Sequence, residues 1–351
     1  MAIRIIHVGV GGRGRHWLEY VAEHPDFTAV AYVDVSEQAL QEARGTAGQE
    51  HGNFFTDLKD AAAKVEADAA LITSPSFLHA QQTYQALDAG LAVLVEKPFG
   101  STLQEAVQVV QRAHEVKRPV VVAENYRFFQ AERTMRHLID AGQVGRLSTA
   151  ICIDRRDQPS HTQGPWVKSM AEPFFMEIAV HHFDSFRYLF NRQPQTLLAR
   201  SYNPPMSDYE GAAAADALIE FEGGTRIQYS GTMVATRYEY SLWVEGDKGD
   251  LWTDRRRAWR RAKGHRFFRP VKPVAVPKGD EARYPKGGTV SLLNHLRDAV
   301  TQGTPPETSG EDNLWTIAMV EAGLRSAQEG RRVGLEEVFT AELQAQAGVT
   351  A

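Results

Sequence analysis

The chain has 351 residues, of which 43 % are hydrophobic and 24 % are charged, so it can bury a sizeable core in about two domains. Its net charge of −5 gives no general attraction to nucleic acid or to an anionic membrane. The single cysteine, Cys152, excludes an intrachain disulfide and a cysteine-cluster metal site. We therefore expect a globular protein whose main partner is neither nucleic acid nor lipid.

The first residues predict the compartment. Residues 1–9 enter a strand directly, without the basic segment, apolar stretch and small-residue cleavage site of a secretory signal. No apolar run approaches the roughly 20 residues that a membrane helix needs. We expect a cytoplasmic protein that does not bind a membrane.

Strand-like and helix-like segments alternate over residues 1–123. Such alternation is typical of a doubly wound α/β domain with a parallel sheet. The expected strands are 3–8, 29–33, 69–72, 92–95 and 120–123, and the expected helices are 15–23, 36–44, 79–89 and 104–116. These segments predict an N-terminal Rossmann domain over residues 1–123.

A glycine-rich turn follows the first expected strand. Gly9 permits a tight turn, Gly11 lets the backbone approach a pyrophosphate, and Gly14 lets the next helix lie close to the strand. The N-terminus of that helix would face the phosphates. A structural turn without a ligand is the alternative. The residues of this turn that we expect to bind a dinucleotide are Gly9, Gly11, Gly12, Arg13 and Gly14.

Asp34 stands 20 positions after Gly14, at the end of the next expected strand. Its carboxylate can accept hydrogen bonds from the ribose hydroxyls, whereas a 2′-phosphate would meet like-charge repulsion. We therefore predict NAD rather than NADP as the cofactor. The alternative role for Asp34 is a helix N-cap, although Ser36 is better placed as the cap.

Two further segments follow buried strands and are expected at the same crevice. The loop after strand 69–72 contributes Ser74, Pro75 and His79. The strand 92–95 leads into Glu96-Lys97-Pro98, and a lysine where a buried strand ends is held rigidly beside the crevice above the sheet. A structural ion pair between Lys97 and Glu96 is the alternative.

The expected helix over residues 174–190 carries a polar stripe. Glu177, His181, Asp184 and Tyr188 fall at i, i+4, i+7 and i+11, so they share one face of a regular helix. A carboxylate one turn before a histidine can fix its tautomer and stabilise the imidazolium, as a general base requires. His182 lies about 100° around the helix and is expected to pack against the core.

The second domain, residues 124–351, is expected to be an α/β domain with a large, mainly antiparallel open sheet. The expected strands are 197–202, 216–221, 225–233 and 238–246, and two helices are expected at 289–301 and 312–329. The segment 251–272 is rich in arginine and aromatic residues, which could bind nucleic acid but is also common in solvated edge strands. We expect no nucleic-acid partner, since no nucleic-acid fold motif accompanies the segment.

Candidate substrate contacts lie where the two domains join. A ring hydroxyl or an anionic substituent could be bound there, and arginine forks suit carboxylate, sulfonate or phosphate. These candidates are Tyr126, Arg127, Arg155, Arg156 and Trp166. No metal site is expected, because the sequence contains neither HExxH nor a cysteine cluster.

Together these motifs resemble the glucose-fructose oxidoreductase / inositol dehydrogenase / MocA (Gfo/Idh/MocA) family. The resemblance extends over essentially the whole chain, and Glu96-Lys97-Pro98 in register with the glycine turn is its most specific part. The other matching segments are the turn 9–14, Asp34, the loop 73–79, Asn125-Tyr126-Arg127 and the tail segment 311–330.

The resemblance implies a Rossmann domain followed by a domain whose open sheet lines the active site and carries oligomer contacts. It also implies that Lys97 lies beside the nicotinamide and the reacting hydroxyl, and that His181 acts as base or acid. The family pattern before this histidine is Asp-x-x-x-His. This chain has Glu177 in place of the aspartate, and the extra methylene changes the reach of the carboxylate.

We therefore predict an NAD-dependent oxidoreductase that acts on a secondary hydroxyl of a sugar, cyclitol or glycoside and forms a dimer or tetramer. Lys97, His181 and Glu177 are its expected catalytic residues, with the roles of Lys97 and His181 open to exchange. One alternative is an NAD-dependent glycosidase that oxidises the sugar transiently, eliminates the aglycone and reduces the ring again. The other is a non-catalytic NAD-binding regulatory protein.

Overall fold

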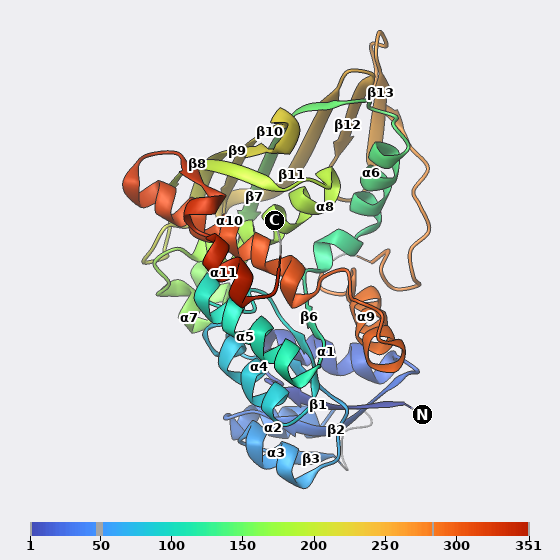
Figure 1. Cartoon of the computed structure of the whole chain (residues 1–351), viewed down its shortest axis with the longest axis vertical. Coiled ribbons are helices and arrows are strands. Elements are labelled where there is room, and N and C mark those ends of the chain that lie inside the picture. Colours follow the sequence, from blue (N-terminus) through green and yellow to red (C-terminus); the bar gives the residue numbers. More distant parts are fainter. Residues whose placement is uncertain (1, 47–51, 283, 350–351) are drawn as a thin grey trace. The chain divides into compact units, whose positions relative to one another are not determined.

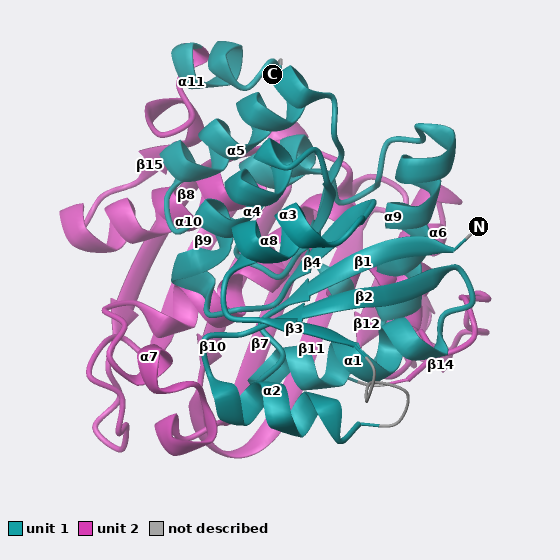
Figure 2. Cartoon of the chain, turned by 90° about the horizontal axis from the view of Figure 1, so that it is seen from below, with its two compact units in different colours: residues 1–125, 284–314, 342–351 teal, residues 126–283, 315–341 magenta. Residues whose placement is uncertain are grey.

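The computed structural model describes residues 2–46, 52–282 and 284–349 (Figure 1). The chain divides into two compact units, which Figure 2 shows in separate colours. Unit 1 consists of residues 1–125, 284–314 and 342–351, and unit 2 of residues 126–283 and 315–341. The predicted division at residue 123 had placed 284–314 and 342–351 in the second domain, whereas the contacts of these segments assign them to unit 1.

Unit 1 is built on a parallel six-stranded sheet in the order β3-β2-β1-β4-β5-β6. Strands β4, β5 and β6 are fully buried apolar runs, as expected of a sheet covered on both faces. The order reverses between β1 and β4, which is where doubly wound sheets bind ligands. The strands are β1 (Ile3–Val8), β2 (Phe27–Val33), β3 (Asn53–Phe55), β4 (Ala69–Ile72), β5 (Ala92–Val95) and β6 (Val120–Val122).

The helices of unit 1 form two groups. Helices α3, α4 and α5 pack beside one another, and α1 contacts α9, as right-handed crossovers on either side of β1 and β4 place them on opposite faces. Helix α9 packs on β5 and β6, which explains why this late segment belongs to unit 1. These helices are α1 (Gly12–Glu23), α2 (Glu37–Arg44), α3 (Leu58–Lys64), α4 (His79–Asp88), α5 (Leu103–Val116) and α9 (Thr289–Gln302), with a short turn η1 (Ser76–Leu78) before α4.

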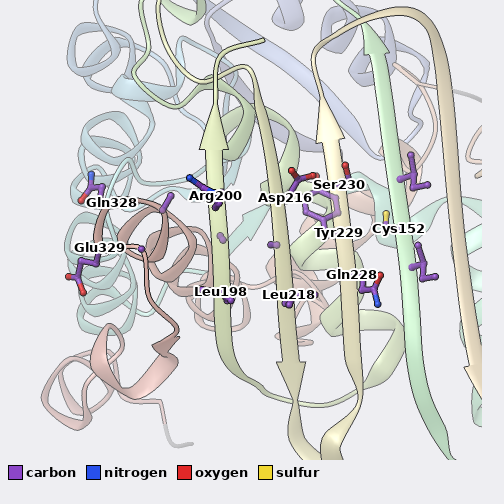
Figure 3. Close-up of a pocket in the computed structure, with 16 residues that line it drawn as sticks. Cys152, Leu198, Arg200, Asp216, Leu218, Gln228, Tyr229, Ser230, Gln328 and Glu329 are labelled. Carbon is purple, nitrogen blue, oxygen red and sulfur yellow. The ribbon is translucent and has the colours of Figure 1, made fainter.

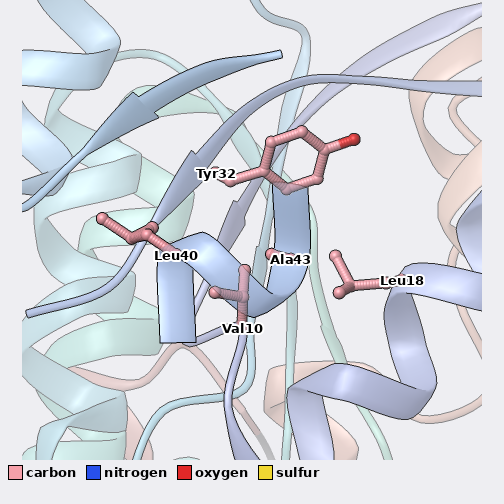
Figure 4. Close-up of a cluster of buried hydrophobic side chains, with 5 residues drawn as sticks. All are labelled: Val10, Leu18, Tyr32, Leu40 and Ala43. Carbon is pink, nitrogen blue, oxygen red and sulfur yellow. The ribbon is translucent and has the colours of Figure 1, made fainter. Parts of the chain in front are cut away.

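A small apolar cluster fixes α1 and α2 against β2 in unit 1. Figure 4 shows its five side chains, all of them at most 3 % exposed: Val10, Leu18, Tyr32, Leu40 and Ala43. Val10 belongs to the glycine turn itself, so burial of its side chain anchors the turn to the core.

Unit 2 is built on a nine-stranded sheet in the order β14-β13-β12-β11-β7-β10-β9-β8-β15. All neighbours are antiparallel except β7 and β10, which run parallel. The strands are β7 (Leu147–Asp157), β8 (Pro194–Tyr202), β9 (Ala214–Phe221), β10 (Arg226–Thr232), β11 (Val234–Gly246), β12 (Gly249–Thr253), β13 (Ala258–Ala262), β14 (Arg269–Pro270) and β15 (Val333–Gly334). The expected fold class, a parallel Rossmann sheet plus a mainly antiparallel open sheet, is confirmed.

One face of the large sheet carries a buried row of side chains and is covered by helices. Helix α6 packs against α8, β12 and β13, and α8 continues directly from a short π-helix, η4. These elements are α6 (Gln130–Asp140), η4 (Phe175–Ala179) and α8 (Val180–Phe190); the shorter ones are η3 (Ser160–Thr162), α7 (Pro165–Lys168), η5 (Glu222–Gly224) and η6 (Leu335–Glu337). Three elements cross a unit boundary: η2 (Asn125–Phe128), α10 (Gly310–Glu329) and α11 (Ala341–Gln346).

Candidate functional site

The carboxyl edge of the unit 1 sheet gathers the predicted cofactor residues. The glycine turn follows β1, the loop with Ser74 follows β4, and Glu96 with Lys97 follows β5. Because β1, β4 and β5 are adjacent parallel strands, their carboxyl ends meet at one edge. The sequence-predicted segments are therefore brought together in one place.

Two glycines of the turn have no room for a side chain. Gly9 has a φ of +83°, and a Cβ there would lie 2.5 Å from the Ser74 backbone nitrogen. A Cβ on Gly14 would lie 1.7 Å from the Gly9 carbonyl oxygen and 2.6 Å from Thr73 Oγ1. The roles predicted for Gly9 in the turn and Gly14 in helix packing agree with these distances.

Asp34 is bonded to the turn that it follows in sequence. Its Oδ2 accepts the backbone N–H groups of Val10 at 3.0 Å and Gly11 at 3.3 Å, and Oδ1 accepts that of Ser36 at 2.9 Å. Ser36, as expected, caps α2 by accepting from the Ala39 N–H. Asp34 therefore holds a negative charge beside the turn.

The loop after β4 is tied to the segment that follows β5. His79 is 2 % exposed, and its two ring nitrogens lie 2.8 Å from the carbonyl oxygens of Ser74 and Pro98. The Ser74 hydroxyl donates to Gln82 Oε1 on α4 at 2.5 Å. His79 thus links the loop after β4 to Pro98, the residue that follows Lys97.

Glu96 is fixed by α1. Its Oε1 accepts from Arg13 Nε and from Trp17 Nε1, both at 2.8 Å. Burial opposes ionisation of this carboxyl, but the Arg13 guanidinium, aided by Trp17 and Lys97, lowers the pKa of Glu96 below its usual range. Arg13 also donates to the Pro285 carbonyl oxygen at 3.0 Å. Arg13 and Trp17 therefore hold Glu96 in addition to Lys97, with which a structural ion pair was the alternative prediction.

The residues at this edge fit a dinucleotide. Positions beside Gly11 and Gly12 leave space for a ligand, since a Cβ on Gly12 would meet nothing within 4 Å and one on Gly11 only ordinary contacts. Among the described residues, no side chain caps the N-terminus of α1, so its first N–H groups can receive a phosphate. Asp34 supplies the acidic group that a ribose requires.

The polar stripe of unit 2 differs from the regular helix expected for it. Residues 175–179 form a π-helix, in which the Val180 N–H donates to the Phe175 carbonyl, and the α-helix begins only at Val180. Glu177 therefore precedes His181 with a wider turn than i, i+4 spacing in an α-helix implies. Such π segments are frequent at functional sites, and the sequence pattern does not reveal them.

Asp184 of this stripe serves the interior of unit 2. It is fully buried, and its two carboxylate oxygens accept from Arg127 Nε at 2.6 Å and Nη2 at 2.5 Å. Thr316 also donates to Asp184, at 3.3 Å. Arg127, a predicted substrate contact, thus has a buried carboxylate partner, and we do not retain it in the substrate site.

The predicted pair Arg155 and Arg156 cannot share one site. They are neighbours on β7, and successive side chains of a strand point to opposite faces. Arg155 is exposed, whereas Arg156 is buried and donates to Asp154 Oδ2 at 2.8 Å and to the Tyr126 hydroxyl at 3.0 Å. Trp166 is half-buried and lies on α7.

His182 is buried against the core as expected. Its Nε2 lies 3.0 Å from Asp154 Oδ2, and its Nδ1 lies 2.7 Å from the Tyr229 hydroxyl oxygen. Burial lowers the pKa of His182 to about 4, although Asp154 acts in the opposite direction. Burial also opposes ionisation of Asp154, but Arg156 and His182 hold its pKa well below the usual range. Asp154 was not among the predicted site residues, since nothing local distinguishes an acidic residue inside a strand.

The open face of the unit 2 sheet has a hollow of about 790 Å³. Figure 3 shows Leu198, Leu218 and Gln228 along one row of this face, and Arg200, Asp216 and Ser230 along the next. None of the predicted catalytic residues lines this hollow.

Two kinds of feature are absent from the described residues. No helix there is long and apolar enough to cross a membrane. No group of three or more histidine, cysteine, aspartate or glutamate side chains in the same residues could hold a metal ion.

A Rossmann unit with this glycine turn and acidic residue at the carboxyl edge of its sheet is typical of dinucleotide-binding proteins. Residues 3–124 match the model of the Gfo/Idh/MocA oxidoreductase family, NAD-binding Rossmann fold, and residues 133–252 match that of the family's C-terminal domain. The chain belongs to the Gfo/Idh/MocA family, and the resemblance drawn from its motifs is confirmed.

Known proteins are similar to this chain in sequence or in fold. The inositol 2-dehydrogenase of Rhizobium meliloti is 25 % identical over 95 % of this chain and 100 % of its own length. An Agrobacterium radiobacter oxidoreductase solved with NAD+, L-tartaric acid and magnesium has a TM-score of 0.86, with 19 % identity over 96 % of this chain and 99 % of that one. The WlbA dehydrogenase of Bordetella pertussis, solved with NADH and UDP-GlcNAcA, has a TM-score of 0.80, with 22 % identity over 95 % and 99 %.

Proposed function

We propose that this chain is an NAD-dependent oxidoreductase that acts on a secondary hydroxyl of a sugar, cyclitol or glycoside. The observation that carries the proposal is the place of Lys97, at the carboxyl end of β5 beside the glycine turn, after a glutamate that α1 holds rigidly. The relative from Rhizobium meliloti, whose name gives inositol as its substrate, supports a hydroxyl of this class.

Bound NAD would supply a hydride acceptor at its nicotinamide ring. In the oxidation direction, His181 takes the hydroxyl proton, Lys97 polarises that oxygen by its charge, and Glu177 orients His181. The roles of Lys97 and His181 can be exchanged without changing the balance of the reaction. Trp166 remains in the proposed substrate site, while Arg127, Arg155 and Arg156 are left out for the reasons given above.

The preference for NAD over NADP is part of the proposal. The Asp34 carboxylate accepts three backbone N–H groups at the crevice edge, so its charge is held in place. A fixed carboxylate accepts ribose hydroxyls and repels a 2′-phosphate.

The test is to follow NADH absorbance while the protein and NAD meet a panel of inositols, aldopyranoses and glycosides, and to measure released aglycone in the same samples. NADH that accumulates, and is lost in Lys97→Ala but kept in the exposed control Lys59→Ala, would support the proposal. Aglycone release that requires NAD without net NADH would establish the redox-neutral glycosidase instead. NAD binding without turnover of any compound would favour the regulatory protein.

We also propose that the open face of the unit 2 sheet binds a second copy of the chain. One register row crosses eight strands of this sheet, and six of its eight members are large apolar side chains. The row is Leu198, Leu218, Gln228, Ile151, Trp243, Trp252, Trp259 and Pro270. Leu218 is 52 % exposed, and a long apolar row on an exposed sheet face is typical of an interface.

The basic segment 251–272, which supplies Trp252, Trp259 and Pro270 to this row, contributes to the fold. Arg261 pairs with Asp250, Arg260 donates to the Gln143 carbonyl at 3.1 Å, and the Trp252 and Trp259 rings stack at 4.2 Å.

Sedimentation of Leu218→Arg tests the proposed interface between two copies of the chain. A dimer or tetramer that becomes a monomer would support the proposal, whereas an unchanged mass, or a monomeric parent protein, would contradict it.

A further inference from the structure

His181 is stacked on the ring of Tyr126. The two ring centroids are 4.1 Å apart and the planes meet at 12°, so the imidazole lies nearly parallel to the phenol. Tyr126 is 4 % exposed, and His181 is 5 % exposed. The tyrosine therefore covers one face of the imidazole and restricts its rotation.

Tyr126 is held in turn by a cation on its other face. Arg255 Cζ lies 4.2 Å from the Tyr126 ring centroid. Two groups this close to one centroid cannot occupy the same face of a ring, so Arg255 and His181 lie on opposite faces. Arg255 also lies 3.6 Å from the centroid of the Tyr240 ring. The four side chains form a column in the order Tyr240, Arg255, Tyr126 and His181, which we call the aromatic column.

The position of Arg255 is strained and buried. Its φ is +66°, a backbone conformation that residues other than glycine rarely adopt, and its side chain is 7 % exposed. It donates to Glu132 Oε1 on α6 at 3.0 Å. Burial raises the pKa of Glu132 to about 7, although Arg255 acts in the opposite direction. Backbone strain and burial of a charge both cost free energy, and they point to a role for Arg255 beyond stability.

The hydroxyl of Tyr126 is fixed by a second network. Arg156 donates to this hydroxyl at 3.0 Å and to Asp154 at 2.8 Å, and Asp154 lies 3.0 Å from His182. His182, the next residue after His181, is therefore linked through Asp154 and Arg156 to Tyr126, whose ring stacks on His181. The contacts on both faces of the ring and at the hydroxyl together fix the orientation of the Tyr126 side chain.

We propose that Tyr126 is a positioning residue for His181, and that Arg255 and Arg156 hold Tyr126 in place for this purpose. The sequence had assigned Tyr126 to the substrate. Its burial and its contacts assign it to the imidazole instead. The consequence for turnover rests on the proposed function, because it requires His181 to be the acid or base.

The test of orientation needs no substrate. Histidines are labelled at 13Cε1 in the full chain saturated with NAD, and the His181 resonance is identified by its loss in His181→Gln. Stacking on a phenol shifts that resonance upfield. We expect Tyr126→Phe, which keeps the ring, to retain the shift, and Tyr126→Leu to lose it. Phe221→Leu, which truncates a fully buried aromatic of the same unit, is the control for general loosening and should leave it unchanged. A His181 resonance that does not move in Tyr126→Leu would overturn the proposal.

Kinetics on the panel compound with the highest rate separate this proposal from the proposed function. We expect Tyr126→Leu to lower kcat about 10- to 100-fold with NAD affinity and KM nearly unchanged, and Tyr126→Phe to restore kcat to within a few-fold. If His181→Gln is inactive but Tyr126→Leu has full kcat, the positioning role is wrong. If His181→Gln is fully active, the acid or base role proposed for His181 is wrong, while the resonance shift still decides whether Tyr126 orients the imidazole.

Discussion

Trp17 donates its indole N–H to Glu96 Oε1 at 2.8 Å, and no part of its side chain is exposed. Trp17 lies on α1, which begins in the glycine turn, and Glu96 precedes Lys97. The bond therefore ties the element that would receive the phosphates to the segment that carries the proposed catalytic lysine. We therefore expect NAD binding and the proposed chemistry to be coupled at this pair of residues.

Replacing Glu96 by glutamine tests this coupling. The variant leaves the Arg13 guanidinium without its charge partner, so we expect a loss of about 1–3 kcal/mol in the free energy of unfolding of unit 1, together with weaker NAD binding. Hydrogen exchange of the β1 amides and NAD titration measure the two effects. Glu115→Gln, which affects an exposed ion pair with Arg112, should change stability by less than about 0.5 kcal/mol. Equal effects of the two substitutions would contradict the coupling.

Gly14→Ala should disrupt the glycine turn. The new Cβ would meet the Gly9 carbonyl oxygen at 1.7 Å, so α1 must move away from β1, at a cost of about 1–3 kcal/mol and with loss of most NAD affinity. Gly45→Ala is the matched control, since Gly45 has a φ of −72° and its Cβ would make only ordinary contacts. We expect that control to be neutral or slightly stabilising. NAD titration and thermal denaturation of both variants check the prediction, and a Gly14→Ala variant that binds NAD normally would refute it.

Unit 1 could be predicted well from the sequence because its strands and turns are recognised from neighbouring residues alone. Each strand from β1 to β6, apart from β3, is a run of apolar residues that ends at a turn, and the glycines mark the crevice without reference to distant residues. Strand β3 and helix α3 were missed, since three strand residues and a seven-residue helix give little periodicity.

Unit 2 was harder to predict because its site depends on pairing between distant residues. The π-helix over 175–179 has no distinctive sequence pattern, so Glu177 was placed on a regular helix. The partner of Arg127 lies 57 positions away, and that of Arg255 lies 123 positions away. Residue type alone assigned such arginines to substrate or surface, because only the fold shows that their charges are neutralised inside the protein.

Asp34→Ser should shift cofactor preference toward NADP. Serine removes the negative charge that would face a 2′-phosphate, and we expect the ratio of NADP to NAD affinity to rise about tenfold or more. Asp57→Ser, which replaces the N-cap of α3 by another capping residue, provides the control and should leave the ratio unchanged. Fluorescence titration with NADH and NADPH measures both variants. A ratio that stays constant in Asp34→Ser would show that another residue selects the cofactor.

His7 should make unit 1 less stable in acid. Burial lowers the pKa of His7 from 6.5 to about 3, so below about pH 6.5 the unfolded chain binds a proton that the folded chain does not. The free energy of unfolding should therefore fall as the pH decreases from about 6.5 to about 3, by about 1.4 kcal/mol per pH unit for this group. His7→Leu should remove that part of the slope. Ile5→Val on the same strand should lower stability by about 1 kcal/mol at every pH and keep the slope. Hydrogen exchange of the β1 amides between pH 4 and pH 7 measures these slopes, and identical slopes for His7→Leu and the parent protein would contradict a neutral buried imidazole.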